Sequence, residues 1–255
     1  MSASAIARAA AVTATAMPLA ACAAPSIDPS LAAPPTIVAW RAARARLAEI
    51  RRAASAPRTQ RVALRLREPR TGRVIEARGA VAIAPPRSLR MILLGPGGTT
   101  ALDLWIDGDR FRFAVPAIEL LRRGDASTPR SDLRGLPIDF LRWWLLVPAD
   151  GALLWTARDG AAQRFVLRDG HAVVDLRVAD DGRVDARRAS WSPKTRGAPP
   201  RRLDEETARA DRVGCGVVRY HQASTGLDVT VTCEGEELTP PNPRAFADPD
   251  AEVAP

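Results

Sequence analysis

The alternation of apolar and polar residues along Leu89–Phe113 constrains the fold of this chain more than any other feature. Apolar side chains take every second position over much of this stretch, and most of the intervening positions are charged. Two turn signals interrupt it, Gly95–Gly98 and Asp107–Asp109. A period of two with glycine-rich corners is typical of consecutive antiparallel strands that share one apolar face. The sequence therefore predicts an antiparallel sheet whose apolar face must be covered or must hold something.

The same pattern recurs on both sides of this stretch. Three Asp-Gly pairs follow one another in the second half of the chain, and each is a strong hairpin signal. The final hairpin turns around Gln222–Gly226. Outside Leu89–Phe113 we expect strands at residues 61–67, 75–83, 118–123, 152–157, 163–167, 172–178, 183–191, 213–221 and 227–233.

Two helices are expected beside the strands. Thr36 is suited to cap a helix that reaches about Ser55, with apolar residues at three- and four-residue spacing. A second, short helix starts near Pro137 and is apolar on nearly all sides, which is typical of a buried helix. The predicted fold class is α+β, mostly antiparallel β: a curved open β-barrel of about 10–11 strands wrapped on both helices.

The basic charge does not indicate a nucleic-acid partner. The net charge of +8 is carried by arginine, since Lys194 is the only lysine in the 255 residues. The arginines mostly alternate along predicted strands, as on a solvated sheet face. No basic patch with interleaved aromatic residues is present in the sequence, so binding of nucleic acid is not expected.

The amino terminus reads as an export and anchoring signal. An apolar stretch at residues 9–21, too short to span a membrane, leads into Leu19-Ala20-Ala21-Cys22. This motif matches the lipobox of bacterial lipoprotein signal peptides, in which the cysteine thiol takes a diacylglycerol. We therefore expect a signal peptide at residues 1–21 and a lipid anchor on Cys22. Ala23 follows instead of an aspartate, which favours the outer membrane, with the protein facing the periplasm.

The expected domain order follows from composition. Residues 22–35 are rich in Ala, Pro and Ser and read as a flexible tether. A single domain is expected at residues 36–234. Residues 235–255 carry several prolines and acids and are expected to form a disordered tail.

No catalytic, cofactor or metal site stands out. The chain has no Gly-x-Ser-x-Gly elbow for acyl hydrolysis, and Gly95–Gly98 lacks the Lys-Ser/Thr ending of a phosphate loop. His171 and His221 are the only histidines, and neither has a second imidazole at ligand spacing. We expect no enzyme activity, no cofactor and no metal.

Cys215 and Cys233 are expected to form a disulfide. A hairpin centred on Ser224 pairs Val217 with Val231 and places the two thiols opposite each other. An exported protein meets an oxidising compartment in which such a pair is oxidised. Two buried free thiols are the alternative.

Two segments resemble the LolB outer-membrane lipoprotein receptors of the LolA/LolB superfamily. Leu93–Leu104, LLGPGGTTALDL, is similar to the region of the third and fourth strands of that family, and Gly135–Pro148, GLPIDFLRWWLLVP, to its mid-chain helix. The resemblance covers about Trp40–Trp191. It implies a half-open barrel with an apolar cavity for acyl chains of a lipid or lipoprotein, and a periplasmic carrier protein as a partner.

The inward rows of the predicted strands supply candidates for the cavity lining. On the residues alone, a filled core against the helices and an open cavity both stay open, and the resemblance favours the cavity. The candidate lining residues are Val62, Leu64, Leu66, Ile75, Val81, Leu102, Leu104, Ile106, Phe111, Phe113, Leu153 and Trp155.

One turn departs from the receptor pattern, and the direction of one tryptophan stays open. In the receptors the turn between the third and fourth strands carries a protruding apolar residue for delivery into the membrane, whereas here Pro96, Gly97 and Gly98 occupy that turn. Binding is therefore predicted more firmly than delivery. Trp105 falls on the acidic face of its strand, where it either contacts a membrane or partner or is covered by a neighbouring loop.

The sequence thus predicts a monomeric, membrane-anchored lipoprotein that binds acyl chains and takes part in lipoprotein localisation. The alternative is an outer-membrane structural or assembly lipoprotein that keeps the fold and binds a protein partner. The size of an apolar cavity in the structure distinguishes the two.

Overall fold

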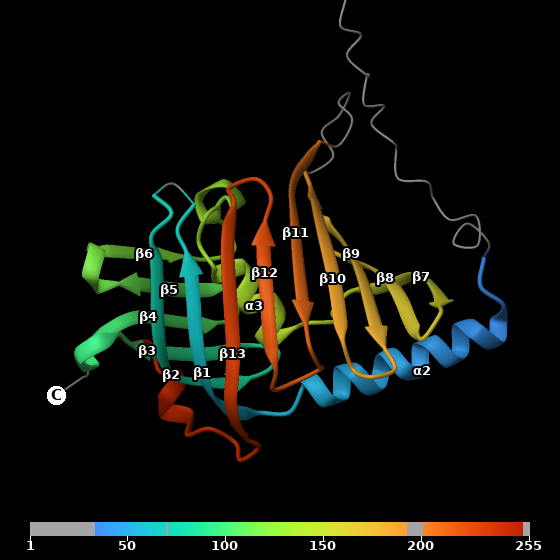
Figure 1. Cartoon of the computed structure of the whole chain (residues 1–255), viewed down its shortest axis with the longest axis horizontal. Helices are drawn as coiled ribbons and strands as arrows, with labels where there is room; N and C mark the ends of the chain where they lie inside the picture. Colours follow the sequence, from blue (N-terminus) through green and yellow to red (C-terminus); the bar gives the residue numbers. More distant parts are fainter. Residues whose placement is uncertain (1–33, 70, 193–200, 252–255) are drawn as a thin grey trace, which may run out of the picture. The chain divides into compact units, whose positions relative to one another are not determined.

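Thirteen antiparallel strands form one sheet in the part of the chain that the structure describes (Figure 1). This structure is a computed structural model and describes residues 34–69, 71–192 and 201–251. The predicted signal peptide and most of the tether lie outside the described residues. The strands are β1 (Arg58–Arg67), β2 (Val74–Ala84), β3 (Ser88–Leu94), β4 (Thr100–Asp107), β5 (Arg110–Val115), β6 (Leu120–Gly124), β7 (Ala152–Asp159), β8 (Ala162–Asp169), β9 (Ala172–Ala179), β10 (Val184–Trp191), β11 (Arg202–Ala210), β12 (Val217–Gln222) and β13 (Leu227–Glu237).

The sheet consists of two meanders joined in its middle. Its strand order is β6-β5-β4-β3-β2-β1-β13-β12-β11-β10-β9-β8-β7, so the first and last strands pair with each other. β6 and β7 are the two edges, and the sheet does not close into a barrel. The predicted α+β class with a curved, open antiparallel sheet is confirmed, with more strands than the expected 10–11.

β11 is the strand that the sequence pattern does not reveal. Its inward positions hold Asp204, Glu206, Ala208 and Ala210, so no row of large apolar residues alternates with polar ones. It lies between β10 and β12 and continues the ladder between them. The missed strand thus places two carboxylates where the alternation rule expects apolar side chains.

Both predicted helices are present. α2 (Ile37–Ala54) starts at Thr36, whose hydroxyl accepts a hydrogen bond from the backbone N–H of Ala39 at 3.2 Å. Its inward stripe buries Ala43, Leu47 and Ile50. α3 (Ile138–Leu146) follows Pro137 and buries most of its residues, as a helix apolar on nearly all sides must. No helix in the described part of the chain is long and apolar enough to cross a membrane.

The core lies between the inner face of the sheet and the two helices. Side chains from α2, α3 and nearly every strand join one buried apolar cluster. Short 3₁₀ turns complete the chain: η1 (Pro96–Gly98), η2 (Pro116–Ile118), η3 (Arg130–Leu133) and η4 (Pro243–Phe246).

The segment predicted as a disordered tail differs from that prediction over its described part. Residues 235–237 extend β13, where Gln60 and Thr59 of β1 pair with them. Farther on, η4 packs over the outer face, and the indole of Trp105 donates a 2.9 Å hydrogen bond to the carbonyl of Phe246. Trp105 is 3% exposed, so of the two alternatives for it the covering segment is confirmed. The proline-rich and acidic composition of this segment gives no indication of these contacts.

Candidate functional site: an apolar pocket at the helix ends

Most of the predicted lining residues belong to the packed core. Those of β1, β2, β4 and β5 point to the inner face of the sheet, as the alternation predicts. There they share one buried cluster with Phe140 and Leu141 of α3, both fully buried. Ile75 and Leu153 are partly buried against the same cluster. The buried lining candidates are Val62, Leu64, Leu66, Val81, Leu102, Leu104, Ile106, Phe111 and Phe113.

Trp155 lies on the opposite face of the sheet. The register between β7 and β8 shifts between Leu153 and Trp155, so one residue, Leu154, is left without a partner. Trp155 consequently pairs with Val166 of β8, and the Arg164 guanidinium lies 5.7 Å from its ring centre. The bulge reverses the alternation, and the expectation that Trp155 continues the lining is wrong.

An apolar pocket of about 430 Å³ lies elsewhere on the inner side. It is bounded by the carboxyl-terminal ends of α2 and α3 and by the strands of the second meander. This volume falls in the range of about 300–1,000 Å³ that is usual for small-molecule sites. Its apolar wall includes Ile50, Ala53, Trp144, Leu145, Leu176, Val178, Val184, Val218 and Val231.

The pocket opens beside the connection from β11 to β12. Val213 in that connection and Leu238 after β13 line the pocket although they are 40% and 67% exposed. Exposed apolar residues on the rim of a pocket mark its entrance. The walls deeper inside, such as Val184 and Val218, are buried.

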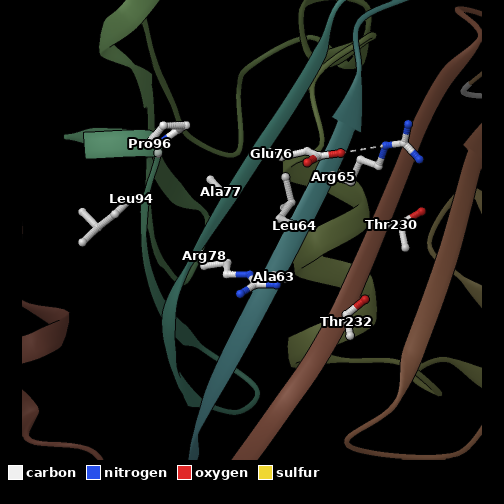
Figure 2. A pocket seen from close by; sticks show the side chains of 11 residues that line it. Ala63, Leu64, Arg65, Glu76, Ala77, Arg78, Leu94, Pro96, Thr230 and Thr232 are labelled. Carbon is white, nitrogen blue, oxygen red and sulfur yellow. Dashed lines mark ion pairs between the residues drawn. The ribbon is translucent and has the colours of Figure 1, made fainter. Parts of the chain in front are cut away.

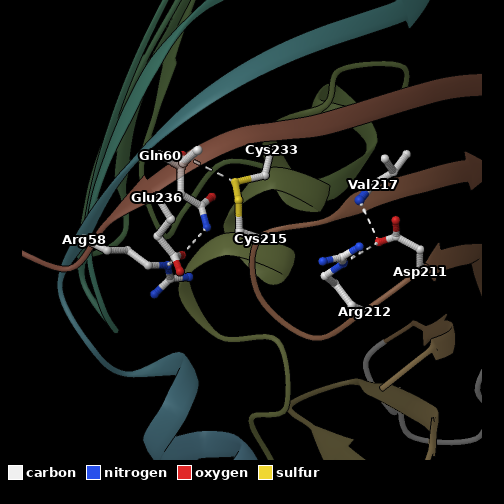
Figure 3. The surroundings of a disulfide bond; sticks show 9 residues. Arg58, Gln60, Asp211, Arg212, Cys215, Val217, Cys233 and Glu236 are labelled. Carbon is white, nitrogen blue, oxygen red and sulfur yellow. Dashed lines mark hydrogen bonds and ion pairs between the residues drawn. A yellow bond between two sulfur atoms is a disulfide. The ribbon is translucent and has the colours of Figure 1, made fainter. Parts of the chain in front are cut away.

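One end of the pocket is polar but internally neutralised (Figure 3). Arg58 donates to the carbonyls of Ala54 and Ala56 at 3.0 and 2.9 Å, and its Nε lies 3.3 Å from Glu236. The amide of Gln60 donates to the same carboxylate at 2.7 Å. Burial lowers the pKa of Arg58, and the charge of Glu236 opposes that shift. The pair leaves this end of the pocket with no net charge for a ligand to balance.

The predicted disulfide is present at the pocket. Cys215 and Cys233 are bonded, with their Cα atoms 5.1 Å apart (Figure 3). The hairpin register differs from the predicted one by one residue, since Val217 pairs with Thr232 and not with Val231. Cys215 therefore lies in the connection before β12, and the disulfide fixes that connection against β13. Cys233 and Gly216 both line the pocket, so the bond holds part of its wall.

The turn between β3 and β4 carries no large apolar side chain at its tip. Pro96, Gly97 and Gly98 form η1, and Gly97 has φ +81°, a conformation that favours glycine. Figure 2 shows Pro96 and Leu94 beside a groove on the outer face, across which Arg65 pairs with Glu76 at 3.2 Å. This groove is open and lined partly by charged side chains, which suits water better than an acyl chain.

A buried polar cluster on β10–β12 is the feature that sequence reasoning missed. The hydroxyl of Tyr220 donates to Glu206 at 2.8 Å, and Gln222 donates to Asp204 at 2.8 Å. Burial raises the pKa of Tyr220, and the charge of Glu206 adds to the shift. Arg188 lies 3.6 Å from Glu206. No group of three or more potential metal ligands occurs within the described ranges.

Comparison with solved structures decides the fold. No family model matches the sequence, and no curated protein matches it. A LolA superfamily protein from Nitrosomonas europaea matches with a TM-score of 0.50 and 13% sequence identity, over 79% of this chain and 97% of that chain. This chain has the LolA superfamily fold.

Two further solved structures match this chain over similar lengths. A putative outer membrane lipoprotein-sorting protein domain from Vibrio parahaemolyticus has a TM-score of 0.45 and 10% identity, over 80% of this chain and 97% of that chain. A DUF1329 family protein from Desulfovibrio piger has a TM-score of 0.45 and 12% identity, over 82% of this chain and 96% of that chain. The Nitrosomonas match shows the LolA-like fold that the resemblance implies, whereas LolB in particular is not confirmed.

Proposed function

We propose that this LolA-like protein is a lipid-anchored lipoprotein that binds the acyl chains of a lipid or lipoprotein in the pocket at the ends of α2 and α3. The pocket of about 430 Å³ is the observation that carries the proposal. Its apolar wall suits an acyl chain, because each methylene moved from water into an apolar site contributes about 0.8 kcal/mol. The LolA-like fold that the chain shares with the Nitrosomonas protein agrees with this ligand class.

The charge state of the pocket supports an uncharged buried portion of the ligand. Arg58 is neutralised by Glu236 and donates to three backbone carbonyls, those of Ala54, Ala56 and Leu145. A negatively charged headgroup would find no unpaired cation there. The chain therefore enters with its apolar end first, and its polar end stays at the rim beside Val213 and Leu238.

The anchoring part of the proposal rests on the sequence. Leu19–Cys22 has the lipobox pattern, and Ala23 favours the outer membrane with the domain facing the periplasm. The Cys215–Cys233 disulfide is in keeping with an oxidising compartment outside the cytoplasm. We propose transfer without catalysis, by a monomer that takes its cargo from a periplasmic carrier protein.

The test is native mass spectrometry of the full protein purified from membranes. We expect a population that carries non-covalently bound lipid or acylated peptide, released on collisional activation. The variant Val184→Trp, which fills the pocket, should lose this population. Val74→Trp, at a 44% exposed site away from the pocket, should keep it. Bound lipid in equal amount on both variants would contradict the proposed site.

The alternative is a structural or assembly lipoprotein with the same fold. One observation favours it: the inward residues of β1–β5 are buried in one apolar cluster together with those of α3. In that case no lipid is bound by the wild-type protein, and the same mass spectra should show a protein partner instead.

A further inference from the structure

The side of α2 that faces away from the sheet is unusual for a solvated helix surface. Its first two residues, Ile37 and Val38, are apolar and 72% and 77% exposed. Arginines follow along the same side, with alanines between them. We define this surface, the outer α2 face, by its residues Ile37, Val38, Arg41, Arg44, Ala45 and Arg52.

The charge on this face is not balanced within the described part of the chain. The side chains of Arg41, Arg44 and Arg52 are exposed and make no hydrogen bond or ion pair with a described residue. Arg51, by contrast, turns inward and donates to the carbonyls of Ala149 and Gly151. The first turn of the helix holds no acidic residue. The face therefore presents three free cations next to two exposed apolar side chains.

Across the sheet, most arginines of the outer surface are paired. Arg90 and Arg112 contact Asp103, and Arg164 contacts Asp175. Such pairs form a charge-balanced surface that needs no partner. The outer α2 face differs because Arg41, Arg44 and Arg52 lack carboxylate partners. The one acidic residue of α2, Glu49, pairs with Arg46. The electrostatic complement of the three arginines is therefore an anionic surface outside the chain.

The outer α2 face lies close in the sequence to the proposed lipid anchor, and this indicates which anionic surface it meets. Only the residues from Cys22 to Pro35 separate the proposed lipid anchor from the helix, and fully extended they span at most about 50 Å. A helix tethered this closely meets a bilayer at high effective concentration. A basic helix side that begins with apolar residues is the type of surface that lies at an anionic membrane interface.

We propose that the outer α2 face docks on the anionic phospholipid surface of the membrane that holds the protein. This inference rests on the proposed lipid anchor at Cys22. Docking would bring the lipid pocket close to the bilayer, because Ile50, Ala53 and Ala54 of the same helix form one of its walls. Only the thickness of α2, about 10–12 Å, would then separate the pocket from the headgroups.

The experiment uses the full lipidated protein with Ala45→Cys as its single reactive thiol. Cys22 is blocked by its lipid, and Cys215 and Cys233 are bonded to each other. A fluorophore on residue 45 is measured in vesicles that contain nitroxide-labelled headgroups, with and without phosphatidylglycerol. We expect strong quenching with phosphatidylglycerol, and little with phosphatidylcholine alone or in 1 M salt.

Charge reversal separates docking from anchoring. Arg41→Glu, Arg44→Glu and Arg52→Glu together should lower the docking constant about 100-fold or more and abolish quenching. The matched control reverses Arg67, Arg168 and Arg219, which are exposed on the outer face of the sheet, and should leave quenching unchanged.

Each other outcome overturns the proposal in a recognisable way. Equal quenching in both triple variants, or none in phosphatidylglycerol vesicles, refutes docking while the anchor stands. If quenching rises with the density of protein on the vesicles and does not depend on anionic lipid, the outer α2 face contacts a second copy of the chain and not the membrane. If the intact mass of the purified protein lacks the diacylglycerol on Cys22, the protein has no lipid anchor, and the proposed docking orientation is refuted together with it.

Discussion

The Nε atom of Arg58 lies 3.3 Å from the Oε1 atom of Glu236 at the polar end of the apolar pocket. Arg58 also donates hydrogen bonds to backbone carbonyls at the ends of α2 and α3. A single buried guanidinium therefore joins both helices to β13, and the pocket lies among the elements that it holds together.

Removing the carboxylate should destabilise the fold. Glu236→Gln leaves Arg58 buried without its counter-ion, and the loss of one partner of a fully buried pair costs about 3–5 kcal/mol. Because the side chain of Glu236 is 25% exposed, we expect a smaller loss, about 2 kcal/mol, in urea denaturation. Glu76→Gln is the matched control, since the Arg65–Glu76 pair is 65% and 69% exposed and should contribute about 1 kcal/mol or less. Equal effects of the two changes would contradict this role of Arg58.

Reduction of the disulfide should loosen the wall of the pocket. The bond closes a loop with a sequence separation of 18, for which the chain-entropy relation gives about 3 kcal/mol of stabilisation. Cys215→Ser together with Cys233→Ser should lower the free energy of unfolding by about that amount. Thiol titration in denaturant should find both cysteines blocked in the purified wild type. Two reactive thiols beyond Cys22 would show that the bond is absent in the protein.

The carboxyl-terminal segment should shield Trp105. Its indole donates to the carbonyl of Phe246, and Asp250 pairs with Arg112 at 3.0 Å and with Arg123 at 2.8 Å. Truncation after Leu238 should increase the quenching of tryptophan emission by acrylamide and shift that emission to the red. In a Trp105→Phe background the same truncation should change neither property. An unchanged emission in the first comparison would mean that the segment does not cover Trp105 in solution.

Tyr220 should make the fold sensitive to alkaline pH. Burial raises the pKa of Tyr220 above its unfolded value of about 10. The neutral form is thus favoured in the folded state, so its stabilisation is complete below pH 10 and is lost as the pH rises above that value. Tyr220→Phe should cost about 2 kcal/mol at pH 7 through the lost hydrogen bond to Glu206. Above pH 10 the variant should show a shallower decline than the wild type.

The fold was largely predictable because alternation and turn chemistry act locally. Gly160 and Gly170 take φ of +57° and +55° in the predicted Asp-Gly turns, and the strands on either side follow. Thr36 caps α2 as expected. β11 was not predicted because its inward positions include Asp204 and Glu206. Their burial depends on hydrogen bonds from Tyr220 and Gln222 of a neighbouring strand.

The pocket could not be found from the same rules. Alternation tells which face a residue of a strand takes, but it does not tell whether a helix fills the space in front of it. Leu104 and Phe113 share one buried cluster with residues of α3. The shorter side chains of Val184 and Val218, in contrast, line the pocket at the ends of both helices. The lining therefore depends on where two helices end, which is a tertiary property. Trp155 lies on the opposite face from the predicted one because of a one-residue bulge, and no local sequence pattern predicts that bulge.

The most direct measurement is a titration of the domain with a fluorescent fatty acid. The chain from Ala23 onward suffices, because all described core residues lie in the single compact unit that starts at Pro35. We predict saturable binding by the wild type and by Val74→Trp, and at least tenfold weaker binding by Val184→Trp with an unchanged melting temperature. Binding by Val184→Trp as tight as that of the wild type, or no saturable binding by the wild type, would contradict the account.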